Sequence, residues 1–138
     1  MTKPWTTAMI LWSWSVILFG AVLVAGIFPP LQGINHFLFD LMSQKTGSLG
    51  TFTPELQFSV GLMGAVTLGW GLTVLAVAQA VTEPNPALWR GITRALIVWF
   101  VIDGAISVMT GFGLNAVSNT LLLGGYLFIM IRSGAQKG

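Results

Sequence analysis

The run ALIVWFVIDGAISVMTGFG, residues 95–113, decides the fold. It is apolar and long enough to cross the roughly 30 Å hydrocarbon core of a bilayer. Its one carboxylate, Asp103, lies near the middle, and a Gly-Phe-Gly turn at residues 111–113 ends it. Because this turn allows only a tight hairpin, the next apolar segment must fold back against the run. The stretch therefore predicts a transmembrane hairpin.

Composition extends this prediction to all 138 residues. Charged residues make up 7% of the chain, against about 25% in soluble domains. Ten charged side chains are too few to cover a water-facing surface. We therefore expect the outer surface to face a lipid bilayer. The formal net charge of +2 is too small and scattered to predict nucleic-acid binding. The absence of cysteine excludes disulfides, thiolate metal sites and a cysteine nucleophile.

Four apolar stretches are predicted to span the membrane, about residues 8–28, 55–80, 88–110 and 114–131. The first could instead be a signal peptide, with Lys3 as its basic region. However, its apolar run is longer than a usual signal core, and it ends in two prolines without a small-residue cleavage site. We interpret it as a retained helix. The predicted fold is an all-α integral membrane bundle in a single domain, residues 1–138.

Between the first two spans lies an amphipathic segment, LQGINHFLFDLM at about residues 31–42. Apolar residues recur there at intervals of three and four, which is the period of a helix with one apolar face. The segment is too short to span a bilayer, so we predict a short helix in the membrane interface.

The basic residues predict the orientation of the chain. Five of them fall at one end of the predicted spans, and Lys45 alone falls at the other. The positive-inside rule then places both termini in the cytoplasm. The five are Lys3, Arg90, Arg94, Arg132 and Lys137.

Two stripes of small residues at strict four-residue spacing are predicted to pack against other helices. Small side chains let helix backbones come into close contact in a membrane, where the hydrophobic effect no longer drives association. The stripe of the second span is Gly61, Ala65, Gly69 and Thr73. The stripe of the fourth span is Ala116, Thr120 and Gly124.

Polar residues in the outer half of the predicted hairpin form a candidate ligand site. Asp103 lies about 12 Å along its helix from the turn, and Asn119 lies about 9 Å along the next. The two are therefore expected at similar depth, close enough to hydrogen-bond. The other candidates are Ser107 and Asn115, one turn nearer the surface, Glu55 at the start of the second span, and His36 in the interfacial segment.

Two interpretations of this cluster remain open. The polar groups could simply hold the helices together, each contributing about 0.6–2 kcal/mol. Alternatively, an intramembrane carboxylate marks a ligand, proton or ion site. His36, the single histidine, could be an axial ligand to a pigment or haem, or merely a polar residue on a wet face. No catalytic, nucleotide or metal motif is present, and no cofactor is required, which favours a protein that is not an enzyme. An enzyme could still use Glu55, Asp103 and His36 together, because catalytic groups need to converge only in space.

The topology resembles that of small bacterial four-helix membrane proteins of the DoxX-like kind. The segments closest in style are FSVGLMGAVTLGWG at residues 58–71 and WFVIDGAISVMTGFGLNAVSNTLLL at residues 99–123. The resemblance implies location in a bacterial inner membrane. It implies little about function, because one fold serves many functions.

The leading functional hypothesis is an accessory or structural subunit whose partners are other membrane proteins or further copies of itself. The alternative is binding of a small hydrophobic molecule, such as a quinone, a lipid or a pigment, around Asp103 and Asn119. A small transporter is a third hypothesis, although the sequence shows no inverted repeat and has a single intramembrane carboxylate.

Overall fold

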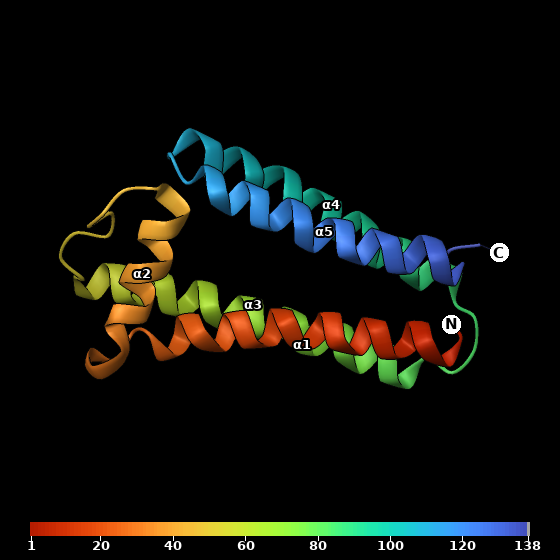
Figure 1. Ribbon diagram of the computed structural model, residues 1–138. Coiled ribbons are helices and arrows are strands. Elements are labelled where there is room, and N and C mark those ends of the chain that lie inside the picture. The colour runs from red at the N-terminus through yellow and green to blue at the C-terminus, as the bar shows by residue number, and fades with distance from the viewer. Residues whose placement is uncertain (138) are drawn as a thin grey trace.

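The computed structural model describes residues 1–137 and consists of helices joined by short connections (Figure 1). Four helices are long and apolar enough to cross a membrane, and one short helix lies between the first two of them. This confirms the predicted all-α membrane bundle. The elements in chain order are α1 (Lys3–Ala25), the 3-10 turn η1 (Pro29–Leu31), α2 (Gln32–Ser43), α3 (Pro54–Ala80), α4 (Pro86–Met109) and α5 (Gly113–Ser133).

The first span lies closer to the N-terminus than predicted. It begins at Lys3 rather than residue 8, because Pro4 fits the first helical turn, where no backbone N–H is needed. It ends at Ala25 rather than residue 28. Phe28 is extended, with φ −81° and ψ 138°, because a residue that precedes proline avoids the helical region.

Side-chain caps fix the start of two spans. At the start of α3, the hydroxyl of Thr53 accepts a hydrogen bond of 3.4 Å from the backbone N–H of Leu56. At the start of α4, Asn85 Oδ1 accepts one of 3.1 Å from the N–H of Leu88. In both helices proline follows the cap and supplies helical φ without an unpaired N–H.

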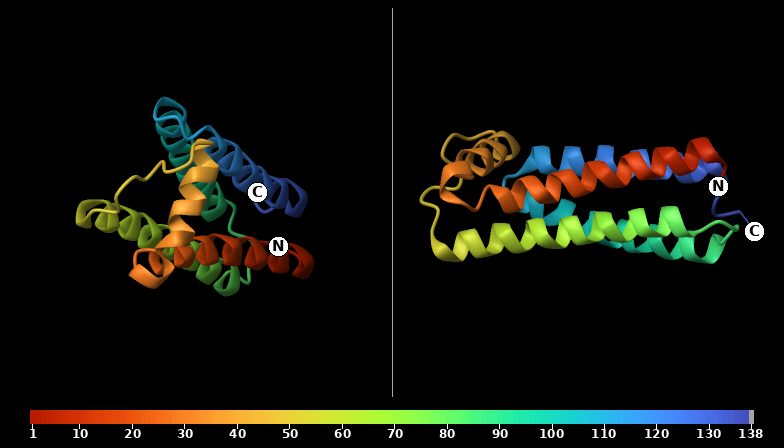
Figure 2. Two further views of the ribbon diagram at one scale, coloured as in Figure 1. Left: turned by 60° about the vertical axis from the view of Figure 1, so that its left-hand side comes forward. Right: turned by 90° about the horizontal axis from the view of Figure 1, so that it is seen from below.

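The spans form two antiparallel pairs, α1 with α3 and α4 with α5 (Figures 1 and 2). Both chain ends lie at one end of the bundle, here called the terminal end. The α4–α5 turn and α2 lie at the opposite end, here called the hairpin end, and there the two pairs diverge.

Glycines bring α1 and α3 into backbone contact. A Cβ added at Gly20 would lie 2.5 Å from Leu68 N and 2.7 Å from Gly64 O. One added at Gly71 would lie 2.9 Å from the backbone N of Ile17. Because no side chain fits between the helices at these positions, this pair is joined by van der Waals contact of the backbones themselves.

An aromatic cluster of Trp12, Trp70, Trp99 and Tyr126 joins all four spans. The ring of Trp12 in α1 meets Trp70 in α3 edge to face at 5.7 Å, and it meets Tyr126 in α5 at 5.4 Å. Trp70 in turn meets Trp99 in α4 at 5.2 Å. The cluster connects the two helix pairs away from the hairpin end, and the ring pair of Trp5 and Phe128 adds a second contact between α1 and α5.

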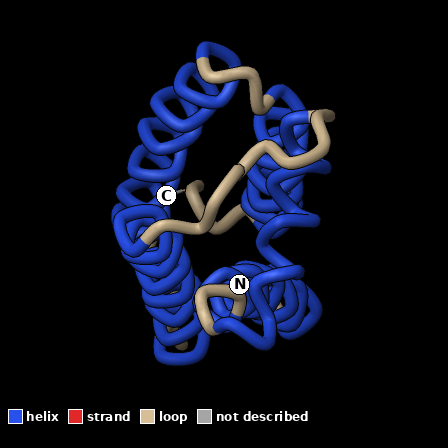
Figure 3. The backbone as a smooth tube through the Cα atoms, turned by 90° about the vertical axis from the view of Figure 1, so that its left-hand side faces the viewer, coloured by secondary structure: helices blue, strands red, loops and turns tan. Residues whose placement is uncertain are grey.

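The short helix α2 bridges the two pairs at the hairpin end. Its Asn35 is fully buried against Gly26 and donates a hydrogen bond of 3.0 Å to the carbonyl of Leu23 in α1. Further along, Phe39 packs edge to face against Phe112 at the α4–α5 turn, with ring centres 5.8 Å apart. Figure 3 shows the following loop crossing this end to reach α3.

The amphipathic pattern of α2 matches its position. Three of its large apolar side chains are exposed, while Asn35 and Ser43 are buried against the bundle. This arrangement is opposite to that of a helix on a soluble protein, and it suits a helix whose outer surface faces lipid. The exposed residues are Ile34, Phe37 and Leu41.

Candidate functional site

The candidate site is a hydrogen-bonded cluster centred on Asp103. Its Oδ1 accepts hydrogen bonds from Asn115 Nδ2 at 3.0 Å, from Asn119 Nδ2 at 2.5 Å and from Ser107 Oγ at 3.2 Å. Asn115 Nδ2 also donates to Ser107 Oγ at 2.8 Å. The structure therefore confirms the predicted proximity of Asp103 and Asn119. Ser107 and Asn115 belong to the same network.

The tight turn between α4 and α5 sets this register. Gly111 has φ 84°, a left-handed conformation that glycine adopts without strain. The backbone N–H of Phe112 donates a hydrogen bond of 2.7 Å to the carbonyl of Ser107, which closes the last turn of α4. Only three residues separate the end of α4 from the start of α5. The same number of residues counted back along α4 and forward along α5 therefore brings Asp103 opposite Asn119.

The network leaves one oxygen of the carboxylate unused. Within residues 1–137, no hydrogen bond reaches Asp103 Oδ2, whereas three donors converge on Oδ1. Ser107 and Asn119 are buried and Asp103 is half-buried. The donors offset the cost of removing one carboxylate oxygen from water, and the other oxygen is available to a hydrogen-bond donor.

Two residues that the sequence associated with this cluster do not join it. Glu55 is exposed in the first turn of α3. His36 packs its ring against Phe52, with centroids 5.7 Å apart. Within the described chain neither side chain hydrogen-bonds to Asp103. Ligation of a pigment or haem by His36 stays a prediction.

Asp40 forms a separate polar site on α2. Its carboxylate accepts hydrogen bonds from the backbone N–H of Gly47 at 2.9 Å and that of Ser48 at 2.8 Å, and a third from the Ser48 hydroxyl. These donors stabilise the ionised form and lower the pKa of Asp40 below its ordinary value of 3.8. The carboxylate thus holds the loop after α2 in place, and it is not directed to Asp103.

The predicted small-residue stripes face outward. A Cβ added at Gly69 or Gly124 would have no atom of the chain within 4 Å, and Ala65, Thr73 and Thr120 are exposed. At the edge of the α3 stripe, a Cβ on Gly61 would contact Ile27. Packing of these stripes against another helix therefore stays a prediction about neighbours outside this chain.

An open apolar groove of about 490 Å³ runs between α4 and α5. Its small residues include Gly104 and Ala105 of α4 and two members of the predicted α5 stripe, Ala116 and Thr120. Thr120 donates its hydroxyl hydrogen bond to the carbonyl of Ala116, so it offers the groove no free donor. The larger lining residues are Phe100, Val101, Val108 and Met109.

Sequence reasoning missed the residues that join the helices within the chain. Gly64 and Gly71 form the face of α3 that meets α1, and Trp12 connects α1 to α5. A signal for the glycines was available: they lie seven residues apart on α3, the spacing of two helical turns. No sequence pattern singled out Asn35, whose Oδ1 is buried without a hydrogen-bond partner.

Four membrane-length helices and an intramembrane polar cluster define the chain as an integral membrane protein of the helical-bundle class. No family model, curated protein or solved structure matches the chain. The resemblance to DoxX-like proteins therefore stays a prediction from topology.

Proposed function

We propose that this protein is a non-enzymatic subunit that packs against a transmembrane helix of another membrane protein. The observation that carries the proposal is the groove between α4 and α5, whose small residues leave about 490 Å³ unfilled on an apolar surface. In a membrane, such surfaces gain stability when a second helix comes close enough for van der Waals contact.

A helix fits this groove better than a small polar ligand does. The α4 residues that line it extend from Phe100 to Met109, which corresponds to about 14 Å along a helix. Small-molecule sites use a few polar groups to orient the ligand. The single polar side chain here, Thr120, already hydrogen-bonds within its own helix.

The direct test compares two identical substitutions in α4. Gly104→Leu fills the groove, whereas Gly91→Leu adds the same side chain where no atom lies within 4 Å and outside the groove. After gentle solubilisation of native membranes, we expect the unaltered protein and Gly91→Leu to co-migrate with a larger assembly in size exclusion. Gly104→Leu should migrate alone. Retention of the assembly by a folded Gly104→Leu variant would contradict the proposal.

A second outward surface is tested in the same way. Gly69 lies on the exposed stripe of α3, so Gly69→Leu should detach a partner that packs there. Mass spectrometry of the peak then distinguishes a different protein from a second copy of this chain. A peak that contains this chain alone, at the mass of one copy and in all variants, would count against both surfaces.

A second candidate function is binding of a hydrophobic molecule that carries one hydrogen-bond donor. It is favoured by the unpartnered Oδ2 of Asp103. Under this hypothesis Asp103→Asn, or Asn119→Leu, removes a co-purified lipid, quinone or pigment and leaves assembly unchanged. Extraction and mass spectrometry of the bound molecules check this, and equal occupancy in both variants would exclude it.

A further inference from the structure

A pocket of about 400 Å³ opens at the terminal end of the bundle, far from the Asp103 cluster along α4. Four parts of the chain build it: the first residues, the α3–α4 connection, the start of α4 and the segment after α5. The lining residues that matter here are Thr2, Glu83, Asn85, Trp89, Ser133 and Lys137.

A hydrogen-bonded network holds the segment after α5 in position. Arg90 Nη1 donates a hydrogen bond of 2.9 Å to the carbonyl of Gln136, and Gln136 Nε2 donates to the hydroxyl of Thr93. That hydroxyl is also 2.9 Å from the hydroxyl of Tyr126, a fully buried side chain. This wall of the pocket is therefore fixed by the folded core.

Trp89 contributes an unused donor to the pocket. Its side chain is 2% exposed and lines the pocket, yet within residues 1–137 its indole Nε1 donates no hydrogen bond. Within residues 1–137, Asn35 Oδ1 is the one polar side-chain atom that is fully buried without a partner, so the indole N–H of Trp89 stays partly accessible. It can therefore donate a hydrogen bond to an oxygen atom of a bound molecule.

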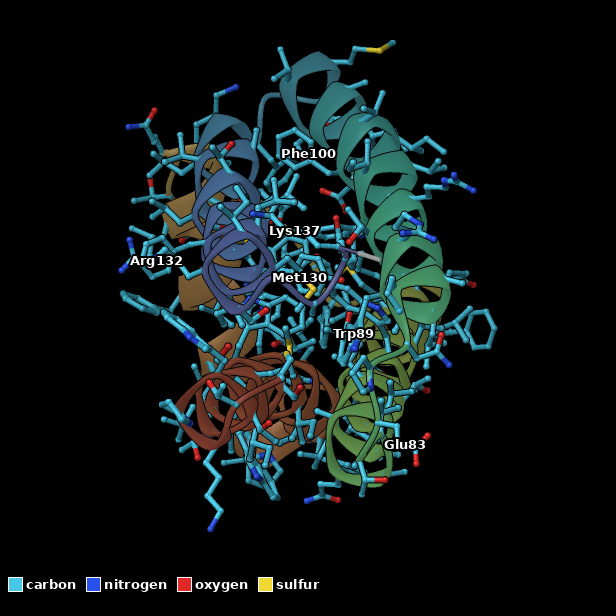
Figure 4. The ribbon with its side chains drawn as sticks, turned by 90° about the vertical axis from the view of Figure 1, so that its right-hand side faces the viewer. Glu83, Trp89, Phe100, Met130, Arg132 and Lys137 are labelled. Atoms are coloured by element: carbon cyan, nitrogen blue, oxygen red, sulfur yellow. The ribbon has the colours of Figure 1, made fainter. Side chains whose placement is uncertain are left out.

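The pocket also carries one charge of each sign. Glu83 lies on the α3–α4 connection and Lys137 on the segment after α5. No ion pair joins these two side chains in the described structure. Figure 4 looks onto this end, with Trp89 and Lys137 toward the middle of the bundle, Glu83 toward the edge and Arg132 pointing away from them.

We infer that this pocket binds a zwitterionic headgroup that combines a phosphodiester with a primary ammonium. The ammonium pairs with Glu83, and the phosphate oxygens accept from Lys137 and from Trp89 Nε1. A phospholipid supplies this chemistry at the depth where helix ends meet headgroups. A soluble glycerophospho-ethanolamine carries the same groups, so the test distinguishes the two sources.

The experiment uses the full chain in mild detergent and native mass spectrometry with three lipids of equal chain length. We expect phosphatidylethanolamine to be retained about tenfold more than phosphatidylcholine. The quaternary ammonium of phosphatidylcholine has no N–H to donate to Glu83. Phosphatidylglycerol has no cation, so it should also be retained less.

Matched variants assign the binding to this pocket. Glu83→Gln should abolish the preference for phosphatidylethanolamine over phosphatidylglycerol, and Lys137→Gln should weaken retention of the favoured lipid. Arg132→Gln removes a charge from the same end outside the pocket and should change nothing. Circular dichroism of each variant checks that the helices remain folded.

Equal retention of the three lipids, or equal losses in Lys137→Gln and Arg132→Gln, would overturn the inference. If soluble glycerophospho-ethanolamine displaces the lipid, the headgroup alone is sufficient for binding. If it does not, while the lipid preference and its dependence on Glu83 persist, the occupant is a membrane phospholipid.

Discussion

The indole Nε1 of Trp12 donates a hydrogen bond of 2.9 Å to the backbone carbonyl of Leu122, and this bond joins α1 directly to α5. Trp14, two residues further along, is 46% exposed. The two tryptophans thus lie on different sides of one helix, because residues two positions apart are about 200° apart around the helix axis. Trp12 is thus one of the residues that connect the two helix pairs.

The first prediction concerns this bond. Trp12→Phe should lower the free energy of unfolding by about 1–2 kcal/mol, because the hydrogen bond is lost and the ring contacts are reduced. Trp14→Phe is the control and should have a smaller effect. Thermal unfolding in detergent, followed by circular dichroism, measures both. Equal changes in the free energy of unfolding for the two variants would show that the interhelical hydrogen bond does not contribute to stability.

The second prediction concerns the contact of α1 with α3. Gly20→Ala places a Cβ against backbone atoms of α3, which cannot move without separating the helices. We expect a loss of about 1–3 kcal/mol from overpacking. At Gly69 the added methyl meets no atom, so Gly69→Ala should leave the same unfolding midpoint unchanged or raised.

The third prediction concerns the hairpin. Asp103→Leu removes the acceptor of three hydrogen bonds, and should destabilise the bundle by about 1–3 kcal/mol. Asp103→Asn retains an acceptor oxygen and should lose less. Unfolding titrations in mixed detergent micelles rank the two. An equal loss in both would mean that the negative charge, rather than the acceptor, stabilises the hairpin.

The fourth prediction concerns pH. The pKa of Asp40 is lowered by hydrogen bonds from Gly47 and Ser48. The stability that the ionised carboxylate gives to the loop after α2 is therefore fully present above the ordinary pKa. That contribution is lost as pH falls through the lowered value, because the protonated form accepts these bonds poorly. Amide hydrogen exchange at both residues, corrected for the intrinsic rate, should accelerate below about pH 4. Asp40→Asn keeps one acceptor oxygen but has no group that titrates, so its exchange should be faster than that of the unaltered protein above about pH 4 and should show no such acceleration below it.

Much of the hairpin was predictable because depth along a helix is simple arithmetic. A rise of 1.5 Å per residue from a tight turn places Asp103 opposite Asn119, and the hydrogen bond between them confirms this. Span number followed from length and apolar character for the same reason. Whether the cluster binds a ligand stays a prediction, because that depends on molecules outside the chain.

The contact face of α3 was harder to predict, because residues spaced strictly four apart do not stay on one side of a helix. Each step of four residues turns about 40° beyond a full circle. The stripe from Gly61 to Thr73 therefore winds away from α1, and at its first position an added Cβ would contact Ile27, just after the end of α1. Residues seven apart, such as Gly64 and Gly71, stay on one side.

Asn35 and Trp12 could not be predicted for a different reason. Each acts through a backbone carbonyl of another helix, at Leu23 and Leu122 respectively. A backbone carbonyl is present at every position and carries no sequence signature. Such contacts are determined by the final packing, so they become visible only in three dimensions.

The difference between the two helix pairs has a consequence for synthesis of the protein. A short turn at Gly111 joins α4 directly to α5, so this pair can form as soon as both helices leave the ribosome. The α1–α3 pair must wait for α2 and the following loop, because its contacts join distant parts of the chain. Once α3 has left the ribosome, the nascent chain should therefore already carry a joined α1–α3 pair, before α5 is available to pair with α4.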